Sequence, residues 1–75
     1  MADKASPKGW VVRVTTMRPG GGFQPVEIYD AAILDPDDAV EAVRKACGAA
    51  PGTIVEAIDE LPSGTDLRDG EVLLR

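Results

Sequence analysis

Residues 35–48 read DPDDAVEAVRKACG, and this stretch decides the fold. Asp35 can accept hydrogen bonds from the unpaired amides at a helix start, and Pro36 suits the first helical position. Two more carboxylates follow in the first turn, where the helix dipole favours negative charge. Gly48 suits the left-handed residue that follows a helix. The sequence therefore predicts a helix over residues 36–47.

The apolar residues of this helix share one arc of about 120° at helical spacing. They are Ala39, Val40, Val43, Ala46 and Cys47, while the charged residues take the opposite side. Because an amphipathic helix must bury its apolar face against another layer, the helix predicts a packed partner elsewhere in the chain.

That partner is predicted to be a sheet. Residues 10–17 alternate with a period of two and are rich in β-branched side chains, which is typical of a half-buried strand. Pro19 and three glycines end this strand and allow the chain to reverse. A second strand follows from Val26, and the loss of alternation after it suggests a bulge near Asp30. The first half of the chain is thus predicted to be a β-hairpin.

Residues 53–61 fit two structures. If the segment is a helix, one face carries Ile54, Val55, Ile58 and Leu61, and a capping box stands at its start. As a strand, the segment begins with three β-branched residues, has strand length and is bounded by Pro51-Gly52 and Pro62. The strand is favoured, and a second helix is the alternative.

A final strand is predicted at residues 71–75, with Leu67 buried before it and Asp69-Gly70 as a turn. The prediction is an α+β, two-layer domain of order ββαββ, over residues 10–75, after a flexible tail at residues 1–9. The alternative is ββααβ, with the second helix at 53–61.

The last segment, Leu67-Arg68-Asp69-Gly70-Glu71-Val72, follows a hairpin and one helix. This order resembles the β-grasp, or ubiquitin-like, superfold, and the ending resembles short bacterial proteins with a Leu-x-x-Gly-Glu-Val strand. The resemblance implies a mixed sheet in which the last strand lies beside the first. Ubiquitin-like carriers end in Gly-Gly, whereas this sequence ends in Leu73-Leu74-Arg75. The carrier function is therefore not expected to transfer.

Composition excludes several kinds of chemistry. The 75 residues contain no histidine and one cysteine, so a Ser–His or Cys–His pair, a disulfide and a thiolate zinc cage cannot be built within one chain. A net charge of −5 with scattered basic residues disfavours nucleic acid. No signal peptide or apolar membrane span is recognised, so a cytoplasmic location and no membrane association are expected.

Three groups of residues invite a chemical role. Cys47 could act as a reactive thiol, but its place on the apolar arc predicts a packing role. Asp35 and its two neighbouring aspartates could attract a cation, but helix capping explains them. Arg18 with Gly20, Gly21 and Gly22 could contact an anion through backbone amides, but the segment lacks the other parts of a phosphate loop. We expect no cofactor.

The three aromatic residues, Trp10, Phe23 and Tyr29, are the candidates for an interaction surface on the sheet. Trp10 and Phe23 could equally close the two ends of a small core. Our first hypothesis is a non-enzymatic module that pairs with itself or with another protein through a sheet edge. The alternatives are a redox protein or enzyme that acts through Cys47 and an accessory subunit that completes a partner's site.

Overall fold

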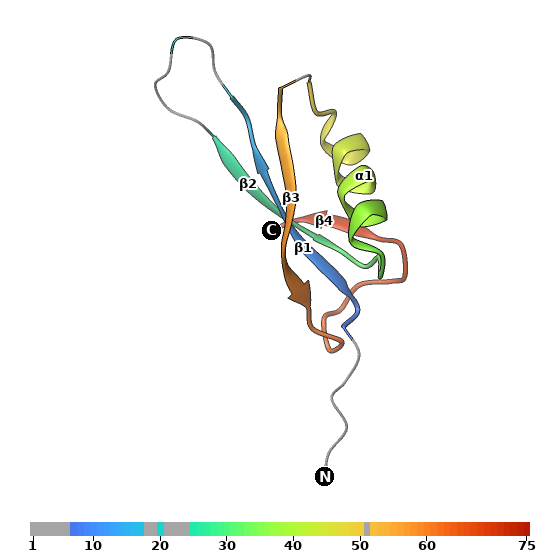
Figure 1. The fold of residues 1–75 in the computed structure, drawn as a ribbon. Helices are drawn as coiled ribbons and strands as arrows, with labels where there is room; N and C mark the ends of the chain where they lie inside the picture. Colours follow the sequence, from blue (N-terminus) through green and yellow to red (C-terminus); the bar gives the residue numbers. More distant parts are fainter. Residues whose placement is uncertain (1–6, 18–19, 21–24, 51) are drawn as a thin grey trace.

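The computed structural model describes residues 7–17, 20, 25–50 and 52–75, and it has one helix packed on a four-stranded sheet (Figure 1). The elements are, in chain order, β1 (Gly9–Thr15), β2 (Val26–Ala31), α1 (Pro36–Cys47), β3 (Ile54–Leu61) and β4 (Val72–Leu74). The predicted small α+β domain of order ββαββ is confirmed.

Helix α1 begins and ends as its sequence predicts. The Asp35 carboxylate accepts hydrogen bonds from the backbone amides of Asp37 at 2.8 Å and Asp38 at 3.3 Å. Gly48 follows the helix with φ 64°, a left-handed conformation, and its amide donates to the Lys45 carbonyl. These contacts satisfy backbone groups that a bare helix end would leave unpaired.

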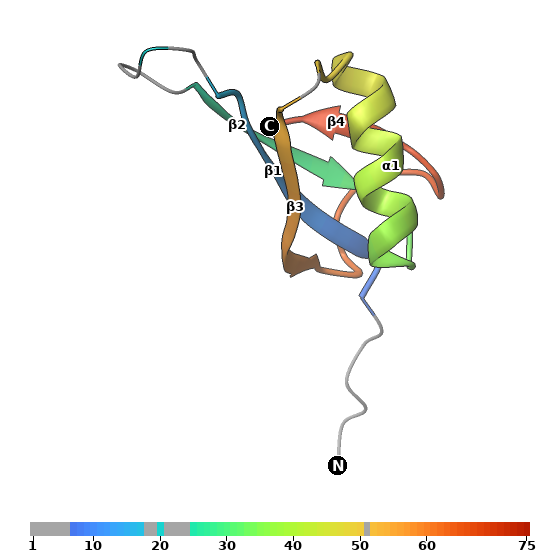
Figure 2. The ribbon, with the colours of Figure 1, turned by 45° about the horizontal axis from the view of Figure 1, so that its top comes forward.

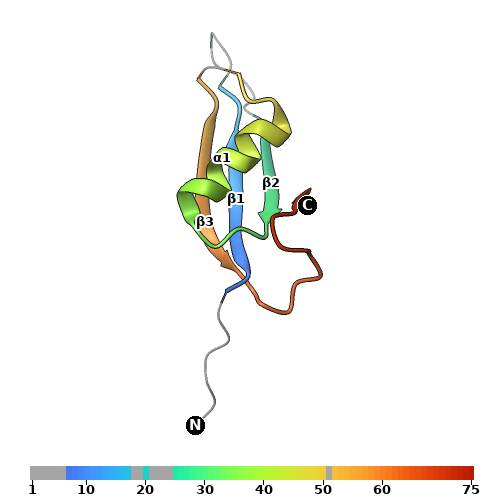
Figure 3. The same cartoon turned by 90° about the vertical axis from the view of Figure 1, so that its right-hand side faces the viewer.

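The strand order in the sheet is β3-β1-β2-β4, and every neighbouring pair is antiparallel. The order implied by the β-grasp resemblance, a mixed sheet with the last strand beside the first, is therefore wrong. The reason is that β2 and β3 already occupy both sides of β1. The segment after β3 runs around the end of the sheet and brings β4 to the far side of β2 (Figure 3).

Residues 54–61 form a strand, so the favoured interpretation is confirmed and the second helix is wrong. The register explains the helix-like spacing of its apolar residues. Val12 pairs with Ala57 and Val11 with Asp59, which leaves Ile58 as an extra residue in β3. One extra residue changes the phase of the alternation. Val55 therefore lies on the helix side, and Leu61 lies on the opposite side of the sheet.

The bulge expected near Asp30 is also wrong. β2 pairs with β1 without interruption from Val26 to Ala31 and then ends. The alternation is lost there because the chain leaves the sheet for the helix. The irregularity in the sheet belongs to β3.

The core has two parts, one on each side of the sheet. Between the sheet and α1 lie Val12, Val14, Tyr29, Ala31, Ala39, Val43 and Val55, all buried. On the other side, the loop after β3 covers a second cluster made of Val11, Ala32, Leu61 and Leu67. Leu67 is 6% exposed, so its predicted burial is confirmed. Helix α1 covers one side of the sheet only (Figures 1 and 2).

The folded part of the chain begins earlier than predicted. Residues 1–6 of the expected tail lie outside the described residues, but Gly9 starts β1 and is buried. The amide of Lys8 donates to the Leu61 carbonyl at 2.8 Å, and its Nζ donates to the Thr65 carbonyl at 2.9 Å. These bonds attach the start of β1 to the loop that follows β3.

Gly9 lies where two segments approach too closely for a side chain. A Cβ at this position would overlap the Ala31 carbonyl oxygen and would lie 2.6 Å from the Ile33 nitrogen. We predict that Gly9→Ala lowers the free energy of unfolding by about 1–3 kcal/mol, since the surrounding backbone must move. Urea denaturation measures this change.

The matched control is Gly64→Ala, because a Cβ at Gly64 meets no atom within 4 Å. This variant is expected to stay within about 0.5 kcal/mol of the parent. Equal stability of the two variants would show that the approach at Gly9 is not close.

Candidate functional site

Of the three candidate aromatic residues, the structure buries Tyr29 in the core and half-buries Trp10. Tyr29 is 9% exposed and packs in the helix-side cluster, so its expected position on a free sheet surface is wrong. The reason is that alternation along β2 turns Tyr29 and Ala31 toward α1. Trp10 packs against the same cluster, and its Nε1 donates to the Leu34 carbonyl at 2.9 Å. Phe23 lies outside the described residues.

Cys47 stands at the last turn of α1 and is half-buried against the helix-side cluster. Its Sγ lies 3.7 Å from the Arg44 carbonyl oxygen, as in a weak hydrogen bond from the thiol. This is the packing position that the apolar arc predicts.

Two further candidate groups are the predicted anion contact and the aspartates at the start of α1. Gly20 is exposed in a turn with φ 81°, whereas Arg18, Gly21 and Gly22, the rest of the candidate anion contact, lie outside the described residues. Asp35 uses its carboxylate to cap α1. Among the described residues, no group of three or more His, Cys, Asp or Glu side chains is arranged to hold a metal ion.

The feature with the clearest binding geometry is the outer edge of β3. In an antiparallel ladder, alternate residues direct their N–H and C=O groups to opposite sides of the strand. The Thr16 amide donates to the Pro25 carbonyl across the hairpin at 3.0 Å, so even-numbered residues of β1 bond to β2. Odd-numbered residues such as Arg13 therefore bond to β3.

The register carries this alternation into β3. Arg13 pairs with Glu56, so the backbone groups of Glu56 point toward β1. Those of its two neighbours, Val55 and Ala57, point outward to the edge of the sheet. Within the described residues, no backbone hydrogen bond from a turn, loop or cap reaches Val55 or Ala57. Figure 1 looks onto this edge, with β3 in front of the other strands.

At each end of the β3 edge a local hydrogen bond uses the outward amide, and we call these two positions the closed ends. At the start, the Thr53 amide donates to the Ala50 carbonyl at 3.1 Å. At the end, the Glu60 amide donates to the side chain of Asp59 at 2.8 Å, just after the bulge. Bulges and local caps of this kind limit strand pairing at a sheet edge. Four outward backbone groups, two each on Val55 and Ala57, remain between the closed ends.

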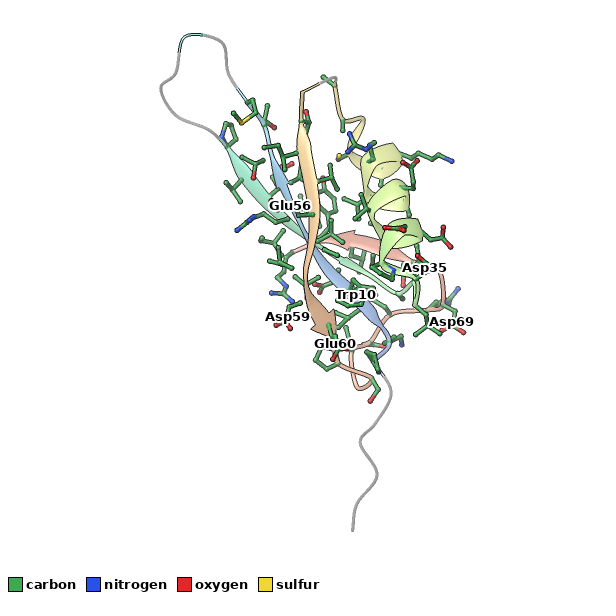
Figure 4. All side chains as sticks on the ribbon, in the orientation of Figure 1. Trp10, Asp35, Glu56, Asp59, Glu60 and Asp69 are labelled. Carbon is green, nitrogen blue, oxygen red and sulfur yellow. The ribbon has the colours of Figure 1, made fainter. Side chains whose placement is uncertain are left out.

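Acidic side chains accompany this edge. Glu56, Asp59 and Glu60 are all exposed and follow one another down β3 (Figure 4). Arg13 lies 3.0 Å from Glu56 and partly offsets its charge, whereas Asp59 and Glu60 join no ion pair among the described residues. Beside them lies a shallow hollow of about 300 Å³, lined by Pro7, Asp59, Glu60, Leu61, Pro62 and Ser63. The edge therefore combines open backbone groups with negative charge.

The sequence did not reveal this site, because the spacing of residues 53–61 fits a helix as well as a strand. It predicted a sheet edge as the binding element but named aromatic residues instead of Val55, Glu56 and Ala57. The available signal was three carboxylates, Glu56, Asp59 and Glu60, in a segment that begins with three β-branched residues.

Comparison with known proteins gives no relative: no family model, curated protein or solved structure matches this chain. In the part of the chain that the structure describes, no helix has the length and apolar character needed to cross a membrane.

Burial, and then the negative charge of Glu27, raises the pKa of the Tyr29 phenol above its ordinary value of 10.0. Because the pKa is higher in the folded state, the neutral phenol favours folding below pH 10. This contribution is lost as the pH rises from 10 through the folded-state pKa. We predict that the free energy of unfolding falls in this range and falls less in Tyr29→Phe.

Urea denaturation of both proteins at several pH values between about 8 and 11 measures the difference. Tyr29 is the only tyrosine in the chain, so its ionisation can also be followed directly by absorbance. Parallel pH profiles for the two proteins would show that the phenol ionises equally in the folded and unfolded chains.

Proposed function

We propose that this domain is a protein-interaction module that binds an extended, basic segment of a partner along β3. The observation that carries the proposal is the set of four outward backbone groups on Val55 and Ala57 between two closed ends of the strand. An extended segment could use them as a fifth strand, which is a common mode of peptide recognition. A short open stretch fits a short peptide and discourages long-range aggregation.

The charge of the edge supports a basic partner. A strand added to β3 would place its side chains beside Glu56, and a longer segment would reach Asp59 and Glu60 at the hollow. Opposite charges across neighbouring strands stabilise the pair, whereas like charges destabilise it. The chain as a whole carries −5, so its field also favours the approach of a cation.

Self-pairing through the same edge is disfavoured. The symmetric antiparallel register that uses all four groups pairs Val55 of one copy with Ala57 of the other. This register sets Glu56 directly opposite Glu56 of the second copy. The two residues form a non-hydrogen-bonded pair, in which facing side chains lie closest, so their like charges repel. The two edges would also bring their unpaired carboxylates together.

Peptide titration tests the proposal. Two ten-residue probes have valine at every second position and either lysine or glutamate between them. The lysine peptide is expected to bind and to shift the amide NMR signals of Val55 and Ala57. The glutamate peptide is expected to bind at least about tenfold more weakly, because like charges meet across the strands.

A proline substitution separates edge binding from other contacts. Ala57→Pro removes an outward amide that β1 does not use, and proline is tolerated on edge strands. Leu74→Pro is the matched control, since by the same alternation its amide points outward from the opposite edge of the sheet. Binding should be lost in the first variant and kept in the second. Equal binding by both variants, or no binding of either peptide, would reject the proposal.

A further inference from the structure

Three side chains of β3 follow its edge on the side of the sheet away from α1. The pairing with β1 fixes this placement, because the even-numbered residues of β1 pack toward the helix and the odd-numbered residues face away from it. Three odd-numbered residues of β1 pair with the side chains in question. They are Ile54, opposite Thr15; Glu56, opposite Arg13; and Asp59, opposite Val11.

The bulge in β3 is the reason that Asp59 joins this line. In an uninterrupted strand, residues 56 and 59 would point to opposite sides of the sheet. Ile58 is an extra residue with no partner in β1, so the alternation shifts by one and Asp59 points to the same side as Glu56.

The line changes from apolar to acidic along the strand. Ile54, at the start, is 42% exposed. Glu56, in the middle, is exposed, and Arg13 at 3.0 Å partly offsets its charge. Asp59, at the end, is exposed and joins no ion pair among the described residues. The two ends of the β3 edge therefore differ in chemistry.

An added antiparallel strand would meet these three side chains in a fixed order. If it bonds to the outward groups of Val55 and Ala57, one of its residues lies directly opposite Glu56. That pair is non-hydrogen-bonded, the type in which facing side chains lie closest. The residue two positions earlier in the added strand lies beside Asp59, and the residue two positions later lies opposite Ile54.

The chemistry of the added strand follows from this order. Its first two residues on this side meet carboxylates, so basic side chains suit them, and its third meets Ile54, so an apolar side chain suits it. The residues between them point to the helix side, beside Val55 and Ala57, where apolar side chains fit. An antiparallel segment is also the better neighbour, since antiparallel pairs are slightly more stable per residue than parallel ones.

We propose that β3 binds an antiparallel segment whose basic residues come before its apolar residues. Asp59 and Ile54 determine this specificity, each at one end of the open stretch. The inference rests on the proposed function, because it describes the segment bound at the same edge. It adds the direction of that segment and the order of its residues.

Two peptides of one composition test the order. The forward peptide is Lys-Lys-Val-Lys-Val-Val-Val, the reversed peptide is Val-Val-Val-Lys-Val-Lys-Lys, and both have blocked, uncharged ends. With the central lysine opposite Glu56, the forward peptide places lysine beside Asp59 and valine opposite Ile54. The reversed peptide exchanges the two. NMR titration is expected to show about fivefold tighter binding of the forward peptide.

Substitutions at the two ends locate the specificity. Asp59→Asn removes the charge but keeps an oxygen that can accept the hydrogen bond from the Glu60 amide. It is expected to weaken the forward peptide about threefold and to leave the reversed peptide unchanged. Ile54→Glu sets a carboxylate opposite a lysine of the reversed peptide and should bring the two affinities within about twofold.

Asp69→Asn is the matched control. Asp69 is exposed in the turn before β4 and lies well away from Asp59 (Figure 4), so this variant loses the same charge at a distance from β3. It should change the affinities of both peptides by the same factor, because only the overall field of the chain is altered.

The outcomes distinguish this inference from the proposed function. Equal binding of the two peptides, or tighter binding of the reversed one, would overturn the inference and leave β3 as a peptide-binding edge. An effect of Asp59→Asn no larger than that of Asp69→Asn would also overturn it. Binding of neither peptide would reject the proposed function and the inference together.

Discussion

Pairing on both sides of β1 is the constraint on which the rest of the structure depends. Its odd-numbered residues bond to β3 and its even-numbered residues bond to β2, so the backbone of β1 is satisfied within the sheet. This fixes Val12 and Val14 beneath α1, where they pack with Ala39 and Val43. It also excludes β4 from the centre and makes β3 an edge strand.

The local parts of the fold could be predicted from the sequence because each had a strong local cause. The cap at Asp35, the left-handed Gly48 and the alternation in residues 10–17 each allow few alternatives. The strand order could not be predicted in this way, because it depends on pairing between strands that lie far apart in the sequence, which no local pattern specifies. The β-grasp resemblance was based on element order alone and gave the wrong neighbour for β4.

The candidate site was harder to predict than the fold. An extra residue at Ile58 moves Leu61 to the side of the sheet opposite Val55, and the resulting apolar spacing imitates a helix. The direction of a backbone group cannot be predicted from residue type, because every residue except proline carries the same N–H and C=O groups as Val55 and Ala57. The aromatic residues were the predicted interaction surface instead, but Tyr29 is buried in the small core.

The central claim is that Val55 and Ala57 direct their backbone groups to solvent while Glu56, between them, bonds to β1. Residue-resolved amide hydrogen exchange measures this directly in the isolated protein. The account predicts an alternation: slow exchange at Glu56 and fast exchange at Val55 and Ala57. Slow exchange at all three amides would show that the edge is already covered and would contradict the account.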